Sequence, residues 1–449
     1  MGRKKDREKQ QGLWVPSSEI AITPAHVYYE RLNVVLNAEK FDSRVEAICR
    51  KYYKSSAGRP SLTPGTYFRM LLLGYFEGID SERGIAWRAA DSLSIRKFLG
   101  YDLSEQTPDH STVSRTRRLY AVETHRAVMQ WVLKILRKHG LARGQSVCID
   151  GTTLEANAAM KSLVRRDSGL SYDEYLKQLA QAEGIQNPTK EQAARLDRKR
   201  KKKGSNDDWT NPNDPSARIT KMKDGRTKLA HKAEHAVDLA DGAVLAVTVQ
   251  PADRGDTSSY VETLEAAQAE SRRAHPAGIE EVVMDKGYHS GAVMMDLVQR
   301  GLRSYVPEPE RGRRKWAGKQ YEQGCVYENR RRVRGARSKR LQKLRGELCE
   351  RSFAHCYQTG ALRRVYLRGS DNVLKRVLVH AAAFNIGLLL RKLSGWGKPR
   401  QAQGRVRMLL SIFVAVQTLC RTVWGPMEGF NVAPDLESRI ALRCSVALQ

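Results

Sequence analysis

The spacing of apolar residues predicts a helical first third of the chain. Thr63 and Pro64 predict a helix start, because a hydroxyl can cap the first turn and proline needs no hydrogen-bond partner there. Apolar residues then recur at helical spacing as far as Gly78. The same spacing predicts further helices at 82–90, 111–119 and 124–139. We therefore expect residues 1–140 to form an all-α region.

Beyond residue 140 the pattern changes to short apolar runs that are typical of strands. Residues 146–150 (SVCID) and 281–285 (EVVMD) each predict a buried strand that ends in an aspartate. Residues 231–249 predict a β-hairpin, because an Asp-Gly step separates two apolar runs. Predicted helices at 258–273, 341–357 and 372–393 complete the pattern. We expect an α/β domain at 141–395 and a partly helical tail at 396–449.

Two segments interrupt this pattern. Residues 160–228 are rich in charged residues and proline, and they are too long for a bare connection, so they predict an insertion that is partly helical and partly flexible. Residues 311–340 carry twelve Lys or Arg against two Glu, a local net charge of +10. Aromatic residues lie among these charges, which favours phosphate contacts combined with packing on bases or sugars. A solvated basic surface is the alternative.

The composition indicates a globular protein with a polyanionic partner. Of 449 residues 41% are hydrophobic, and 78 Lys and Arg against 49 Asp and Glu give a net charge of +29. This excess favours binding to nucleic acid or an acidic membrane. The sequence has no uncharged apolar run of membrane-spanning length and no secretory signal pattern, and its seven cysteines lack metal-binding spacing. We expect a cytoplasmic nucleic-acid-binding protein with reduced thiols.

Asp150 and Asp285 are the candidate catalytic residues. Each ends a predicted buried strand, at the edge where sheets of this class place their sites. If the strands are neighbours, the carboxylates converge and require a cation, and oxygen ligands suit Mg²⁺ or Mn²⁺. A two-metal site needs a third carboxylate, for which Glu347 and Glu350 are candidates; we prefer Glu350. For each acid alone, a strand-end turn, a helix cap or a solvated side chain is the alternative.

Several segments, in this order, resemble the DDE transposases of bacterial insertion sequences. The matching segments, within roughly residues 58–395, are GRPSLTPGTYFRMLLLGYFEGIDSERGIAW, SIRKFLG, PDHSTVSRTRRL, CIDGTTLEANA, KLAHKAEHAVDLADGAVLAVTV, VVMDKGYHS and ERSFAH. The resemblance implies an RNase H-like mixed sheet flanked by helices, an α/β fold, preceded by an all-α DNA-binding region. It also implies that Asp150, Asp285 and Glu350 form a catalytic triad, which holds two Mg²⁺ or Mn²⁺ ions and serves DNA strand cleavage and strand transfer.

The sequence departs from the family pattern around Glu350. Many relatives have an Arg four residues before the Glu and a Lys seven residues after it, but Gly346 and Tyr357 stand at these positions here. The candidate sources of the missing positive charge are Arg345, Arg351 and His355.

The resemblance implies that the partner is double-stranded DNA, both the terminal repeats of the element and target DNA. It also implies a homodimer on DNA in the bacterial cytoplasm, associated with the nucleoid. The candidate DNA-binding residues are Arg115, Arg117, Arg118, Lys286, Tyr288, His289, Arg330, Arg331, Arg332, Arg334, Arg345 and Arg351. For each, an ordinary surface or packing role is the alternative.

Three other functions compete with this interpretation. One is a catalytically inactive or domesticated sequence-specific DNA-binding protein. The second is a nuclease on the same fold that resolves DNA junctions. The third is a serine or tyrosine recombinase, which would form a covalent protein–DNA intermediate.

Overall fold

The structure is a computed structural model that describes residues 25–53, 61–199, 205–222, 224–310, 312 and 314–401. Residues 35–397 form one compact unit. Most of the predicted tail, from residue 402 onward, lies outside the described residues, as do two arginines of the basic segment, at positions 311 and 313.

The described part of the N-terminal region is all-α, as its apolar spacing predicts. Its helices are α1 Ala25–Ala38, α2 Phe41–Cys49, α3 Pro64–Glu77, α4 Glu82–Asp91, α5 Leu93–Leu99, α6 His110–Leu119 and α7 Val122–Lys138. The predicted start of α3 is confirmed, because the Thr63 side chain accepts a hydrogen bond from the Thr66 backbone N–H. Gly78 ends the helix with a left-handed φ of 69°, which glycine adopts without strain.

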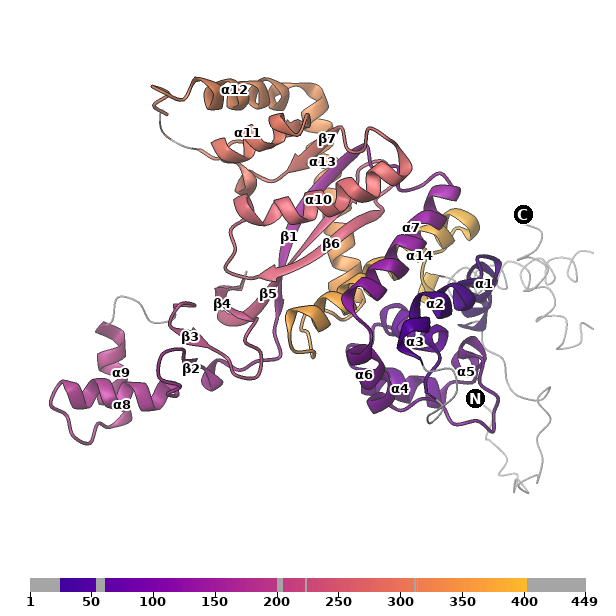
Figure 1. Cartoon of the computed structure of the whole chain (residues 1–449), viewed down its shortest axis with the longest axis horizontal. Coiled ribbons are helices and arrows are strands. Elements are labelled where there is room, and N and C mark those ends of the chain that lie inside the picture. Colours follow the sequence, from indigo (N-terminus) through magenta and orange to yellow (C-terminus); the bar gives the residue numbers. More distant parts are fainter. Residues whose placement is uncertain are drawn as a thin grey trace, which may run out of the picture. The chain divides into compact units, whose positions relative to one another are not determined.

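A mixed sheet forms the centre of the second region (Figure 1). Its strands are β1 Ser146–Glu155, β4 Arg218–Lys221, β5 Thr227–Asp238, β6 Val244–Pro251, β7 Glu281–Met284 and β8 Arg303–Tyr305. The order is β6–β5–β1–β7–β8, and β4 pairs with the first residues of β5. The hairpin β5–β6 is antiparallel to β1, whereas β7 and β8 run parallel to it. The predicted mixed α/β architecture is confirmed.

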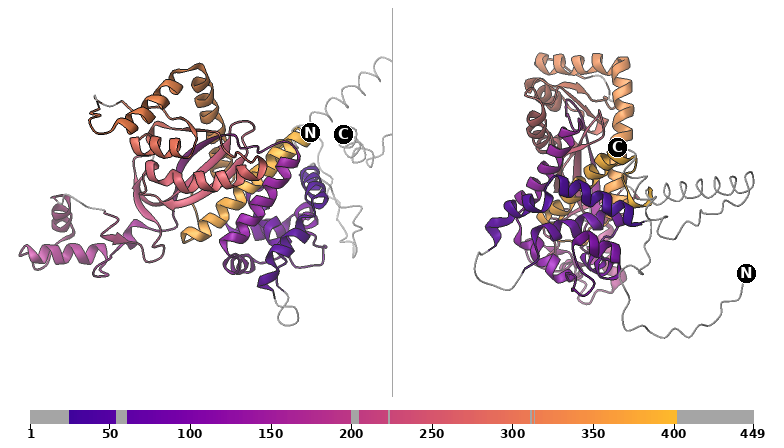
Figure 2. Two further views of the ribbon diagram at one scale, coloured as in Figure 1. Left: turned by 45° about the horizontal axis from the view of Figure 1, so that its top comes forward. Right: turned by 90° about the vertical axis from the view of Figure 1, so that its right-hand side faces the viewer.

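Helices cover both faces of the sheet (Figures 1 and 2). On one face, α10 (Asp256–Ala274) places Ser259 against Glu234 of β5. On the other face, α13 (Ala336–Phe353) places Ser352 against His235. Since consecutive strand residues point to opposite sides, the two helices lie on opposite faces. We call the side under α13 the front face and the side under α10 the back face.

The remaining helices of this region are α11 Gly291–Gln299, α12 Gln320–Arg334 and α14 Ser370–Ser394. Residues 320–340 of the basic segment lie in α12 and the first turns of α13. Helix α14 packs along α7 and β6. The stretch Ser370–Gln401 is long and apolar enough to cross a membrane, but its most apolar window is completely buried inside the protein. Helix α14 is therefore a core helix.

The predicted insertion is folded over most of its described length. It contains β2 Val164–Arg165, α8 Tyr172–Ala182, α9 Lys190–Lys199 and β3 Trp209–Thr210. Its own small apolar cluster surrounds Trp209, which is 2% exposed. The Arg165 guanidinium lies over the Trp209 ring, 5.6 Å from its centroid. Part of the basic run Arg198–Lys203 lies outside the described residues.

Candidate active site

Asp150 and Asp285 lie on adjacent strands at the same height of the sheet. The parallel register of β1 and β7 pairs Ile149 with Met284, and each aspartate is the next residue of its strand. Their side chains are 23% and 50% exposed, respectively. The convergence that the two sequence runs predict is therefore present.

The prediction that β1 ends at Asp150 is wrong. The strand continues to Glu155, because β5 pairs with it throughout, from Val147 opposite Asp238 to Glu155 opposite Ala230. Only the parallel partner β7 stops at Met284. Asp150 thus lies at a step in the sheet, where β1 loses one of its two neighbours. This step leaves its carboxylate partly exposed within a continuous, rigid strand.

Arg345 of α13 joins the two aspartates. Its guanidinium is 2.9 Å from Asp150 Oδ2 and 3.8 Å from Asp285 Oδ1. The side chain of Gln342 holds the guanidinium in place by accepting a hydrogen bond from Arg345 Nε at 3.1 Å. The two carboxylates therefore share one positive charge, which is what two nearby acids require.

Buried contacts hold α13 on the front face. Cys148 Sγ and Cys349 Sγ are 2.7 Å apart, and both thiols are free. His235, opposite Asp150 in the register, hydrogen-bonds through Nδ1 to Ser352 Oγ at 3.0 Å. Its Nε2 contacts the Tyr357 hydroxyl at 2.5 Å, in the π-helical turn Ala354–Thr359 that follows α13. Burial lowers the pKa of His235 to about 3, so the imidazole stays neutral.

Glu350 is exposed on α13, whereas Cys349 is buried against β1. Its alternative, Glu347, is also exposed and forms an ion pair with Arg351. Among the residues that the structure describes, no three His, Cys, Asp or Glu side chains are grouped to hold a metal ion. The structure therefore brings together two of the three predicted acids, and the third remains a prediction.

Three predicted DNA-binding residues are buried in the protein, which corrects the sequence interpretation. Arg117 pairs with Glu82 at 2.6 Å and is 8% exposed. Tyr288 and His289 are each 1% exposed. A tyrosine in this position has no accessible ring face on which a base could stack. Tyr288 and His289 face inward because the chain turns back onto the sheet after Asp285, where Tyr288 donates to Glu234 of β5.

The other predicted DNA-binding residues lie at the surface or in ion pairs. Exposed positions are held by Arg115 and Arg118 of α6, Lys286 after β7, and Arg331 and Arg334 of α12. The other four contact protein groups. Arg330 pairs with Glu308, and Arg332 donates to Ser304. Arg345 pairs with Asp150, and Arg351 pairs with Glu347.

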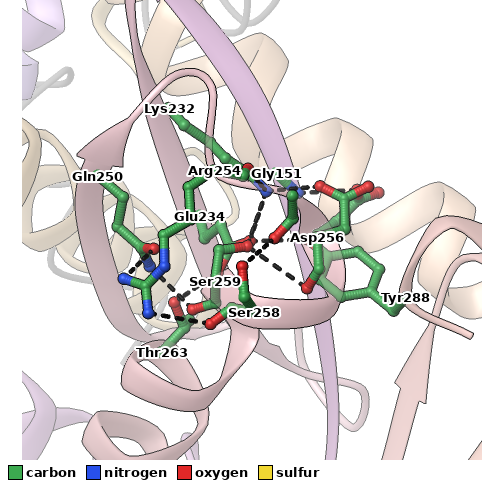
Figure 3. Close-up of polar contacts among 12 residues, drawn as sticks. Gly151, Lys232, Glu234, Gln250, Arg254, Asp256, Ser258, Ser259, Thr263 and Tyr288 are labelled. Carbon is green, nitrogen blue, oxygen red and sulfur yellow. Dashed lines mark hydrogen bonds and ion pairs between the residues drawn. The ribbon is translucent and has the colours of Figure 1, made fainter. Parts of the chain in front are cut away.

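The back face contains a buried ionic network that was not predicted from the sequence. Glu234 is 0% exposed and Lys232 is 6% exposed, and their charged groups are 3.2 Å apart. Figure 3 shows this pair among side chains of α10, with Tyr288 reaching it from the segment after Asp285. In the strand HKAEHAVDL these two charges occupy alternate positions, a pattern that usually indicates a side facing water.

The family of the chain follows from two matches. Residues 145–386, more than half of the chain, match the family described as transposase DDE domain. The chain belongs to the DDE transposases. Residues 17–119 also match the family described as transposase domain (DUF772), which covers most of the helical region. No curated protein and no solved structure is significantly similar to the chain. The predicted family is thus confirmed, and DNA is the substrate that it implies.

The donor set of the site agrees with the divalent metal ions that DDE transposases normally use. Asp150 and Asp285 offer only oxygen ligands, as Mg²⁺ and Mn²⁺ prefer. Their carboxylates already share the Arg345 cation, so this place in the protein attracts positive charge.

Proposed function

We propose that this transposase binds the ends of its insertion sequence and catalyses DNA strand cleavage and strand transfer with Asp150, Asp285 and Glu350. The observation that carries this proposal is the pair of matched aspartates on β1 and β7 that share Arg345. A protein that only binds DNA has no need for two converging carboxylates at a step in its sheet. Glu350 completes the triad by its place on α13, the helix that lies over the two aspartates.

The proposed cofactor is a pair of Mg²⁺ or Mn²⁺ ions held by Asp150, Asp285 and Glu350. Such ions lower the pKa of an attacking water or terminal 3′-hydroxyl and stabilise the leaving oxygen of the phosphodiester. Asp150 has the central position for this role, since it lies on the strand between β5 and β7.

Arg345 then has two successive partners. Without DNA and metal its guanidinium neutralises the two aspartates. With Asp150 and Asp285 holding a divalent cation, the guanidinium would be available to bind a phosphate of the substrate, for which its planar donors are well suited. Arg345 thereby substitutes for the basic residues that this sequence lacks at Gly346 and Tyr357.

The proposed DNA contacts are the exposed basic side chains. Arg115 and Arg118 of α6 serve end recognition by the N-terminal region, 1–140, while Arg331 and Arg334 of α12 bind phosphates beside the catalytic domain, 141–395. Arginines that contact phosphate release counterions, so binding should weaken steeply with salt. We also propose that a homodimer holds two ends of the element, in the bacterial cytoplasm at the nucleoid.

The decisive experiment is cleavage of a labelled duplex that carries the end of the element, with Mg²⁺ or Mn²⁺. Asp150→Ala, Asp285→Ala and Glu350→Ala should bind this duplex like the wild type and lose at least about a thousandfold in nicking, since a metal-binding acid supplies several kcal/mol. Glu347→Ala, one helical turn from Glu350, is the matched control and should still cut.

Three results would contradict the proposal. Cleavage by Glu350→Ala but not by Glu347→Ala would move the third acid by one turn. A wild type that binds the end and never cuts with any metal would favour the inactive DNA-binding protein. A trapped covalent protein–DNA adduct would indicate a recombinase instead.

A further inference from the structure

The back face of the sheet, directly behind Asp150, holds a fully buried carboxylate. Glu234 of β5 pairs with Gly151 of β1, so the two residues point to the same side of the sheet. Gly151 has no side chain to fill this space: a Cβ atom there would lie 3.3 Å from both Glu234 Cγ and the Tyr288 hydroxyl. The glycine that follows Asp150 therefore lets a charged group lie immediately behind the catalytic strand.

Each oxygen of Glu234 has protein partners. Thr263 of α10 donates to Oε2 at 2.8 Å, and Tyr288 donates to Oε1 at 3.1 Å. Ser259 of α10 also donates to Oε1. Lys232 supplies the compensating charge, with Nζ 3.2 Å from Oε1. A buried ion pair is tolerated only with such additional hydrogen bonds, because desolvation of the two charges is costly.

Tyr288 connects this network to the front face. It is the last residue of the short 3-10 turn Lys286–Tyr288, which begins immediately after Asp285. The Asp285 carboxylate caps the first residue of the turn by accepting from the Lys286 N–H at 2.7 Å. Burial and the charge of Glu234 raise the pKa of the Tyr288 hydroxyl, so it stays a donor. One end of the turn thus carries a catalytic acid, and the other end is anchored to β5.

A second contact supports the same turn. Lys232 Nζ donates to Asp256 Oδ1 at 2.5 Å, and Asp256 lies against Gly287 in the middle of the turn. A Cβ atom at Gly287 would be 2.6 Å from Asp256 Oδ2, so only glycine leaves room for this approach. The Lys232–Glu234 pair therefore contacts the turn through Tyr288 and through Asp256 (Figure 3).

We infer that Lys232, Glu234 and Tyr288 are positioning residues that fix the Asp285 carboxylate beside Asp150 for metal binding. They act through the turn after Asp285 and touch neither metal nor DNA. This inference rests on the proposed function, because it requires that Asp150 and Asp285 hold the metal. It assigns a task to the Tyr of the Asp-Lys-Gly-Tyr segment that does not involve DNA.

The test compares two tyrosines of equal burial in the full-length protein. Tyr288→Phe removes the hydroxyl that anchors the turn. Tyr260→Phe removes the same group from a 2% exposed tyrosine of α10 that donates to Asp296 at 2.6 Å.

Mn²⁺ binding to the DNA-free protein is titrated by electron paramagnetic resonance, so that the readout is independent of cleavage. We expect Tyr288→Phe to weaken Mn²⁺ binding by about tenfold, the lower end of the effect of hydrogen bonds that orient metal ligands. Tyr260→Phe should leave Mn²⁺ binding unchanged.

Two further variants separate failure of the inference from failure of the proposed function. Asp150→Ala and Asp285→Ala should abolish the Mn²⁺ binding measured in the wild type. If they do not, the proposed metal site is wrong, and the positioning role is overturned with it. If they do, but Tyr288→Phe binds Mn²⁺ as the wild type does, the positioning role alone is overturned. Equal weakening by Tyr288→Phe and Tyr260→Phe would overturn it too, because it would indicate a general loss of packing.

Discussion

The acidic residues on the two faces of the sheet differ in their burial and in their partners. On the back face Glu234 is completely buried, and its oxygens are occupied by Lys232 and three hydroxyl groups. On the front face Asp150 and Asp285 are partly exposed and share the single guanidinium of Arg345. The Glu234 charge is compensated inside the protein, whereas the two front-face carboxylates share one cation and are in contact with solvent. An acid that is fully buried among protein partners supports structure, and one that stays partly exposed to solvent is available for chemistry.

The largest effect on stability is expected on the back face. Glu234→Ala leaves the buried Lys232 ammonium to the partly exposed Asp256 and removes its fully buried countercharge, and loss of one partner of a buried pair costs about 3–5 kcal/mol. Urea unfolding followed by circular dichroism measures this loss. Asp285→Ala on the front face is the matched control and should cost far less, because half of its side chain is in contact with water. Equal losses would remove the proposed difference between the faces.

A smaller effect concerns pH and His235 of the front face. Burial lowers its pKa to about 3, whereas an unfolded histidine titrates near 6.5. Between these values the unfolded chain takes up a proton that the folded chain does not. Stability therefore falls as the pH falls from about 6.5 toward 3, by up to about 1.4 kcal/mol per pH unit for this residue. His235→Gln should reduce the slope of unfolding free energy against pH, measured between pH 6 and 4.

The control for this slope is His275→Gln, which removes an exposed imidazole. Acid sensitivity that is the same in the wild type and in His235→Gln would show that the buried imidazole under α13 does not contribute. His125 of α7, whose pKa burial lowers to about 4, adds to the slope of the wild type and of both variants alike.

The smallest effect on stability is expected at Arg345. Its pair with Asp150 is open to solvent on one side, so Arg345→Ala should cost less than about 1 kcal/mol. Removal of a competing cation should tighten Mn²⁺ binding to the DNA-free protein by about threefold to tenfold, a coupling of roughly 1 kcal/mol. Calorimetric titration measures this change, and Arg351→Ala on the same helix is the control. Weaker Mn²⁺ binding in Arg345→Ala would indicate that the guanidinium organises the site instead of competing with the metal.

The sequence revealed the front face better than the back face. Asp150 and Asp285 could be predicted because each follows an apolar run, and the parallel register of the two strands brings these positions side by side. Lys232 and Glu234 could not be identified as buried, since alternate polar residues in a strand usually face water. Only the tertiary fold shows that α10 covers this side of the hairpin.

The third acid shows another limit of the sequence. Apolar spacing predicted the helix that carries Glu347 and Glu350, but it could not say which side faces the sheet. That choice is made by packing between distant segments, in which Cys349 lies on Cys148. The length of β1 was missed for a related reason, since its second half depends on pairing with β5 alone.

The extension of β1 past Asp150 has a consequence for how such enzymes diversify. The insertion leaves β1 after Glu155 and returns through β4 and β5 opposite that residue, where Glu155 pairs with Ala230. Because it leaves and returns at neighbouring points, this segment can be exchanged for a longer or shorter one without moving Asp150 or Asp285. The number of residues between the two acids can then differ among related proteins, while the positions of the acids in the sheet stay the same.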